Sequence, residues 1–176
     1  MKSIFTIFIT CISFFSISQK FKIDTKEATI NFYYQSEDTK GVFTGVTATI
    51  DLDLLNLSKS TLNGDADITT LSTGNIARDK HLKSKTYFNA KLFPTMSFKS
   101  SEIKIEQADA THPEQTVING TLNLKGFNKQ VKFIASLIEG ELVLTSSVLA
   151  DDFGLAIKAG KETSLVTIEM RFKAEK

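Results

Sequence analysis

The residues with the most chemical potential lie together in one stretch, TGNIARDKHLKSKTYFNAKLFPTMSF, which runs from Thr73 to Phe98. Arg78, Asp79 and His81 are nearly adjacent there, and several aromatic residues follow them. A carboxylate and an imidazole can serve in acid–base catalysis, but neighbours in sequence need not face each other in the fold. An arginine and a histidine beside apolar side chains also suit a pocket with a few placed polar groups.

The rest of the chain gives little support for catalysis. Its two histidines, His81 and His112, are too few to form a histidine cluster for a metal ion. The chain has no G-x-S-x-G motif, and its one cysteine lies near the N-terminus. We therefore predict a protein that is not an enzyme, with no catalytic residue, no metal ion and no cofactor. Turnover of a bound molecule by His81 is the alternative.

The charged stretch itself predicts a short helix. Thr73 or Asn75 has the side chain of a helix N-cap, and residues 76–83 contain good helix formers with no glycine or proline. The helix is expected to end near Lys85, and a phenylalanine–proline pair leads into the following strand.

Almost everything else alternates apolar and polar residues with a period of two, as half-buried strands do. A bend is indicated at Phe43 and Gly45, and hairpin turns are expected at residues 126–129 and 139–141. About eight or nine such strands must hide their apolar faces against one another, in a sandwich or in a closed antiparallel barrel. The periodicity alone does not separate these two architectures.

The N-terminus has the parts of a secretory signal peptide: a basic residue, an apolar run and then small residues. We expect cleavage after Ser18, which divides the chain into a signal peptide (1–18) and one domain (19–176). At about a dozen residues the apolar run is too short to span a bilayer. Lipidation at Cys11, in the middle of this run, is the less favoured alternative. The protein is therefore predicted to be periplasmic or secreted.

Removal of the signal peptide leaves a balanced charge. The chain has 21 basic and 20 acidic residues, and the cleaved segment contains Lys2 and no acid. A nucleic acid or an anionic membrane would find no basic field to approach on such a surface. We expect no nucleic-acid partner and no integral membrane span.

Four segments resemble the YceI-like family in order and spacing: GVFTGVTATIDLD, TLSTGNIARDKHLKSKTYFNAKLFPTMSFKS, INGTLNLKGFNKQVKF and DDFGL. The second segment is long and specific, and Tyr87 is its mild departure, at a position where the family often has phenylalanine. The resemblance implies an all-β fold, an antiparallel eight-stranded lipocalin-like barrel with one short helix in a connection. It also implies an exported protein that holds an isoprenoid or similar amphiphilic lipid, of quinone or polyprenyl type, in the barrel bore.

Under this interpretation a lipid is the expected ligand, carried for transport or storage. Arg78 and His81 would meet its head group, and Asp79 would fix the helix to the barrel rim. The apolar bore is predicted to be lined by Phe32, Tyr34, Phe43, Ile50, Phe88, Phe93, Phe98, Leu122 and Phe133. The alternative is a barrel filled by its own side chains that acts as an envelope stress or interaction module. A homodimer remains open.

Overall fold

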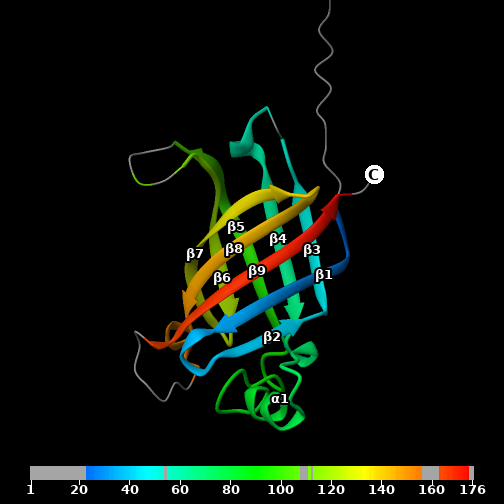
Figure 1. Cartoon of the computed structure of the whole chain (residues 1–176), viewed down its shortest axis with the longest axis vertical. Coiled ribbons are helices and arrows are strands. Elements are labelled where there is room, and N and C mark those ends of the chain that lie inside the picture. Colours follow the sequence, from blue (N-terminus) through cyan, green and yellow to red (C-terminus); the bar gives the residue numbers. More distant parts are fainter. Residues whose placement is uncertain (1–22, 54, 108–110, 112, 156–162, 175–176) are drawn as a thin grey trace, which may run out of the picture.

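A single antiparallel sheet, strongly curled, makes up most of the molecule (Figure 1). The computed structural model describes residues 23–53, 55–107, 111, 113–155 and 163–174. The predicted signal peptide at residues 1–18, Cys11 and His112 lie outside the described residues.

Within the described residues the sheet has nine strands in the order β2-β1-β9-β8-β7-β6-β5-β4-β3. Short 3-10 turns interrupt the connections at Gln35–Glu37, Leu57–Lys59, Ile68–Thr70 and Ala150–Phe153, and the helix α1 is Ile76–Leu82. The strands are β1 (Ile23–Tyr34), β2 (Thr39–Phe43), β3 (Val46–Asp51), β4 (Thr61–Asp67), β5 (Thr95–Glu106), β6 (Gln115–Leu124), β7 (Phe127–Ile138), β8 (Glu141–Leu149) and β9 (Leu165–Ala174).

The two strands at the ends of this order, β2 and β3, are consecutive in the chain and are separated only by Thr44 and Gly45. The first pairs with β1 and the second with β4, so one bent strand returns the sheet to its own starting edge. Thr70 holds the bend, because its Oγ1 accepts hydrogen bonds from the backbone N–H of both Thr44 and Gly45. Counted as one bent strand, β2 and β3 give the eight strands that the resemblance implied.

The prediction of an all-β antiparallel barrel with one helix in a connection is confirmed. The bend was expected at Phe43 and Gly45, and the chain turns there. A bridge between Val42 and Ser72 continues the pairing past the bend, with N···O distances of 2.8 and 2.9 Å.

Large apolar side chains fill the end of the barrel away from α1. Strand β5 begins beside the helix and runs away from it, so Ile103 lies near the far end and pairs with Ile118. Both are buried, as are Leu144 and Phe172 on β8 and β9. The core therefore closes this end of the bore with its own side chains.

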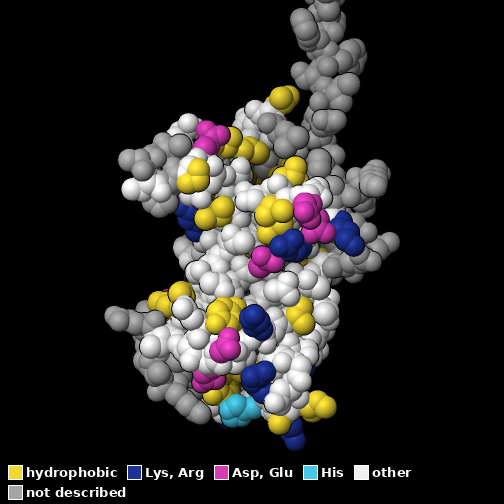
Figure 2. Space-filling model, viewed as in Figure 1, with side chains coloured by type: hydrophobic (Ala, Val, Ile, Leu, Met, Phe, Trp, Pro, Cys, Tyr) yellow, Lys and Arg dark blue, Asp and Glu magenta, His cyan; other side chains and the backbone are white. Residues whose placement is uncertain are grey.

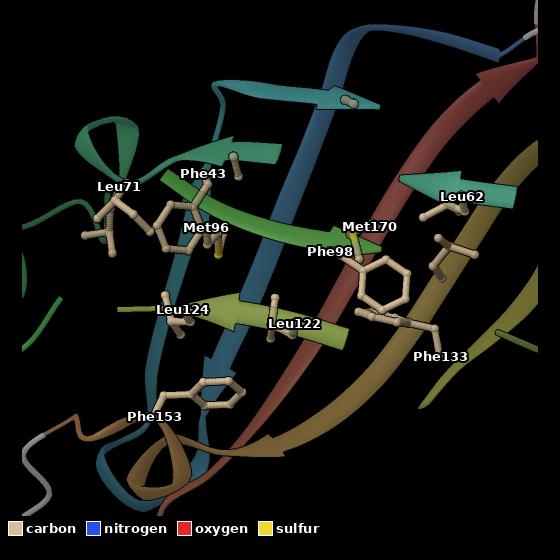
Figure 3. Packing of buried hydrophobic residues seen from close by; sticks show 14 of the residues in the cluster. Phe43, Leu62, Leu71, Met96, Phe98, Leu122, Leu124, Phe133, Phe153 and Met170 are labelled. Atoms are coloured by element: carbon tan, nitrogen blue, oxygen red, sulfur yellow. The ribbon is translucent and has the colours of Figure 1, made fainter. Parts of the chain in front are cut away.

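Two aromatic rings stand at the transition from this filled end to the middle of the bore (Figure 3). The rings of Phe98 and Phe133 meet edge to face, with centroids 5.1 Å apart and an interplanar angle of 78°. The Phe98 ring lies against Gly120 on the neighbouring strand, where only a residue without a side chain leaves it room.

Two hairpins have two-residue turns in which both residues have positive φ, as a type I′ turn requires. Glu139 and Gly140, with φ of 53° and 82°, connect β7 to β8 as the sequence predicted. The turn between β6 and β7 is Lys125–Gly126, with φ of 53° and 82°, so the prediction of residues 126–129 was too late by one residue at its start. Phe127 begins the next strand because the type I′ turn is complete after Gly126.

Helix α1 begins where the sequence predicted. The side chain of Asn75 accepts a hydrogen bond from the backbone N–H of Arg78 at 3.1 Å, which is the contact of an N-cap. The last helical residue is Leu82, and residues 83–94 fold back along the helix before β5 begins. We refer to residues 73–94 as the cap, because this segment lies across one end of the barrel (Figure 1).

Hydrogen bonds hold the cap together and fasten it to the barrel rim. The Asp79 carboxylate accepts from the backbone N–H of Thr73 at 2.8 Å and from its hydroxyl at 2.6 Å. The Arg78 guanidinium donates to the Thr73 hydroxyl and carbonyl, at 2.8 and 3.1 Å, and to the Thr39 hydroxyl at 3.3 Å. Thr39 belongs to β2, so Arg78 connects the helix directly to the sheet.

A lysine provides a second attachment. Lys125, in the β6–β7 turn, donates through Nζ to the carbonyl of Gly154 at 2.5 Å and to the carbonyl of Thr86 at 3.3 Å. Partial burial lowers the pKa of Lys125 from its ordinary value. The ammonium group thus joins Gly154, directly after the 3-10 turn Ala150–Phe153, to the part of the cap that follows the helix.

Gly120→Ala should destabilise the barrel by about 2 kcal/mol, as overpacking in a filled core does. The added Cβ would lie 2.4 Å from Cζ of Phe98 and 2.5 Å from the carbonyl oxygen of Lys99, which belongs to the backbone. Urea denaturation measures the free energy of unfolding. Gly64→Ala is the matched control, because its nearest neighbours lie 3.4 and 3.7 Å away. Equal losses in the two variants would contradict this account of Gly120.

Asp79→Asn should lower the free energy of unfolding by about 1 kcal/mol near neutral pH, because hydrogen bonds to a charged acceptor are stronger than neutral ones. Burial raises the pKa of Asp79, but the hydrogen bonds from Thr73 and the nearby charge of Lys83 outweigh it and hold the pKa below its ordinary value. Since the folded-state pKa is the lower one, this stabilisation exists above the unfolded pKa and is lost as the pH falls through the folded pKa.

The difference between wild type and Asp79→Asn is therefore expected to shrink below about pH 4, the ordinary range of an aspartate. Denaturation at a series of pH values measures this. Glu139→Gln, at an exposed turn, is the control for general charge effects. If the difference in the free energy of unfolding stays constant down to acidic pH, the ionised Asp79 carboxylate is not the acceptor that holds Thr73.

Candidate functional site

An apolar cavity of about 200 Å³ lies inside the barrel between the filled far end and the cap. Its walls come from both halves of the sheet and from the cap, and nearly all of them are hydrocarbon. The apolar lining includes Ile30, Phe32, Phe43, Val46, Leu82, Phe88, Met96, Phe98, Leu122, Leu124, Phe133, Phe153, Val166, Ile168, Met170 and Phe172. The bore is therefore open over part of its length and filled over the rest.

Small residues on two adjacent strands create the open part. Ala48 on β3 pairs with Gly64 on β4, and the next inward position on β4 is Ala66. Gly64 in turn pairs with Phe98 on β5. Eight strands enclose a bore that large side chains can fill, so a patch of alanine and glycine on the inner wall leaves space unfilled.

Polar groups gather where the cavity meets the cap. Glu37 and Thr39, from the turn and strand after β1, line the cavity together with Arg78 and His81 of α1. Glu37 and His81 are exposed, so the opening to solvent lies between the β1–β2 turn and the helix. Tyr87 lines the same end. We call this polar rim the mouth of the cavity.

Arg78 has capacity beyond its structural role. Three of its hydrogen bonds go to Thr73 and Thr39, whereas a guanidinium carries five N–H donors. His81 makes a tilted, edge-type contact with Tyr87, with ring centroids 4.7 Å apart. These side chains can offer donors to a polar or anionic group that rests at the mouth.

The predicted residues fall into two groups. Seven of the nine side chains expected in the bore line the cavity: Phe32, Tyr34, Phe43, Phe88, Phe98, Leu122 and Phe133. Both predicted head-group residues, Arg78 and His81, also line it, and Asp79 lies at the rim in contact with Thr73. Contact between any of them and a ligand remains a prediction.

Ile50 and Phe93 do not line the cavity. Ile50 is half-buried and packs against the core, and its partner on β4, Leu62, lines the cavity in its place. The ring of Phe93 lies over the β6–β7 turn, where it would be 3.2 Å from a Cβ at Gly126. Phe93 therefore supports the junction of cap and barrel instead of the bore.

The sequence analysis missed several lining residues. Val166, Ile168, Met170 and Phe172 alternate along β9 and all face the cavity, so their period of two contained the necessary signal. Phe153 lies in a 3-10 turn, where no periodicity identifies an inward side chain. The small residues of β3 and β4 were also missed, because the search favoured large aromatic side chains.

Asp79 and His81 are not arranged as a catalytic pair. The carboxylate is engaged by Thr73, and residues two apart on a helix do not face each other. Across the described residues, no group of three His, Cys, Asp or Glu side chains is placed to hold a metal ion. In the same part of the chain, no helix is both long and apolar enough to cross a membrane.

Comparison with known sequences identifies related proteins. The model of the YceI-like domain matches residues 21–175. A UPF0312 protein of Photorhabdus laumondii is 35% identical over 98 residues, which cover 56% of this chain and 48% of the relative. Protein YceI of Salmonella newport is 29% identical over 128 residues, which cover 70% of this chain and 64% of the relative. The matched stretch thus spans half to two thirds of these relatives.

Three solved structures share the fold. Burkholderia cenocepacia BcnA superposes with a TM-score of 0.66 at 19% identity, covering 86% of this chain and 97% of that one. The Campylobacter jejuni YCEI protein gives 0.61 at 24% identity, with coverages of 78% and 85%. A polyisoprenoid binding domain from Saccharophagus degradans gives 0.54 at 14% identity, with coverages of 87% and 97%.

At these identities the structural likeness establishes the fold, and the family assignment rests on the sequence match. That match runs from residue 21 to residue 175, so it includes every strand of the barrel, the cap and the mouth of the cavity. The chain belongs to the YceI-like family.

Proposed function

We propose that this protein is an exported lipid-binding protein that holds an isoprenoid or similar amphiphilic lipid in its barrel for transport or storage. The observation that carries the proposal is the cavity, which is apolar along its walls, filled at one end and polar at its mouth. Such a shape suits a molecule with a hydrocarbon tail and one polar end. The printed name of the Saccharophagus degradans neighbour, a polyisoprenoid binding domain, supports the ligand class.

The size of the cavity limits how much of the tail it holds in this form. An apolar cavity of about 150 Å³ in another protein binds benzene, a six-carbon ring. A cavity of about 200 Å³ therefore has room for roughly one or two five-carbon isoprene units. Met96 and Met170 line it, and their flexible side chains allow the bore to adapt to a longer tail.

Burial of the tail supplies most of the binding free energy. At about 0.8 kcal/mol for each buried CH₂, one isoprene unit gains about 4 kcal/mol before the cost of ordering the tail. The donors of Arg78 and His81 then orient a carbonyl, hydroxyl or phosphate at the mouth. Quinone and polyprenyl lipids both combine such a head with an isoprenoid tail.

Export and the absence of catalysis belong to the same proposal. The signal-peptide pattern at residues 1–18 supports a periplasmic or secreted location. The filled far end favours the alternative, an envelope module that binds no ligand. The two functions differ in whether filling the cavity with a larger side chain weakens the binding of a prenyl chain.

Ala48→Leu is this substitution. It adds apolar volume to the wall of a cavity that holds one or two isoprene units, so we expect the Kd for a short prenyl alcohol to rise about tenfold or more. Fluorescence competition and native mass spectrometry measure this binding. Thr49→Leu is the matched control. Thr49 follows Ala48 on the same strand, but its side chain is exposed on the outer face of the barrel. A lipid-binding carrier is refuted if the wild type takes up no prenyl chain, or if both variants bind it equally.

His81→Ala should change the affinity for the same prenyl alcohol by less than about fivefold, since one exposed polar contact contributes about 1 kcal/mol or less. The affinity should instead depend steeply on tail length up to the capacity of the bore. Titration with prenyl alcohols of increasing length provides the measurement. A head-group-dominated site would reveal itself by the opposite pattern, with a large loss in His81→Ala and little dependence on the tail.

A further inference from the structure

The outer surface of the cap exposes two large apolar side chains. Ile76 is 88% exposed and Leu92 is 67% exposed, although both lie in the segment that covers the mouth of the cavity. Single exposed aliphatic residues are common on protein surfaces, so these two gain meaning only together with the charges around them.

Helix α1 turns Ile76 away from the barrel, and Leu92 lies in the segment that follows the helix. Arg78, Asp79 and Leu82 form its covered face, toward the rim and the cavity. Ile76 and Lys80 are one turn apart on the opposite, exposed face. The outer face of α1 is therefore presented to whatever approaches this end of the molecule (Figure 1).

The cap segment is basic, although the exposed Glu37 lies beside it at the mouth. The cap contains five basic residues and one acidic residue, a net charge of +4, within a chain of nearly balanced charge. Lys80, Lys85 and Lys91 are exposed, and no ion pair is found for them within the described part of the chain. Figure 2 shows hydrophobic and basic side chains, and also acidic ones, close to the histidine at this end.

The far end provides an internal comparison. Leu137, at the end of β7, is 69% exposed, close to the value for Leu92. Acidic residues surround the adjacent β7–β8 turn, where Glu139 and Glu141 flank Gly140. Leu137 therefore lies beside Glu139 and the Glu141–Arg171 ion pair, whereas Ile76 and Leu92 share the cap with three exposed lysines. The overall charge balance, which had argued against an anionic membrane, conceals this difference.

We propose that the outer face of the cap docks onto an anionic lipid bilayer, with Ile76 and Leu92 buried among the head groups and Lys80, Lys85 and Lys91 beside the lipid phosphates. Segments that bind at a membrane interface combine apolar side chains with lysines in this way. Docking at this end brings the mouth, between Glu37 and His81, to the bilayer surface. A tail can then pass between bilayer and cavity with little exposure to water.

This inference extends the proposed function by naming the surface from which the ligand is taken, but its test needs no ligand. Sedimentation of the mature protein with vesicles of phosphatidylcholine alone, or mixed with phosphatidylglycerol, measures partitioning. We expect binding to the mixed vesicles that weakens as salt is raised, and little binding to the neutral ones. Equal partitioning into the two kinds of vesicle, or none into either, overturns the proposal.

The variants locate the contact. Each lysine near an anionic surface contributes about fivefold to partitioning, so the triple variant Lys80→Gln, Lys85→Gln, Lys91→Gln should lose about a hundredfold. The double variant Ile76→Ser, Leu92→Ser should lose about tenfold or more. Leu137→Ser is the control and should bind as the wild type does. A loss in the control equal to that in the cap variants would refute docking through the cap.

Prenyl-alcohol affinity in solution, measured on the same variants, separates the two proposals. The substituted side chains do not line the cavity, so the variants should bind the alcohol as tightly as the wild type does. Lost docking with normal alcohol binding supports the cap as a membrane contact. If the protein docks normally but takes up no prenyl chain, the proposed lipid binding is refuted and the proposed membrane contact stands.

Discussion

The central constraint of the structure is that the inward side chains are too small to fill the whole bore of the barrel. Closure through the bent β2–β3 strand fixes the width of the bore, so side chains alone decide how much of it is filled. At the far end Ile103, Ile118 and Leu144 fill it. Beside the cap, Ala48 and Gly64 do not, and the cavity results.

The cap makes this hollow usable. An open barrel end would expose apolar walls to water, whereas the cap covers them and places polar groups around the remaining opening. Arg78 does both, because its guanidinium binds Thr73 and Thr39 while the same side chain lines the cavity. Structural and binding roles are therefore compatible in this residue.

The alternation of apolar and polar residues was enough to predict the strands, and the N-cap of Asn75 was enough to predict the helix. Periodicity says which residues share a face, but the family resemblance was needed to separate a barrel from a sandwich. Periodicity also cannot say which inward side chains border the open part, which is why Ile50 was expected in the lining although it packs against the core instead. A cavity forms where side chains are small, so a prediction based on aromatic residues does not identify Ala48 and Gly64.

The hollow itself is an argument for a ligand. Core cavities destabilise proteins by about 24 cal/mol for each Å³, so about 200 Å³ corresponds to roughly 5 kcal/mol relative to a filled core. That is comparable with the entire net stability of many domains. A ligand that binds only the folded barrel returns stability in proportion to the logarithm of its concentration over Kd. A protein built only as a rigid module would gain from larger side chains at these positions, since its far end shows that the same strands accommodate them.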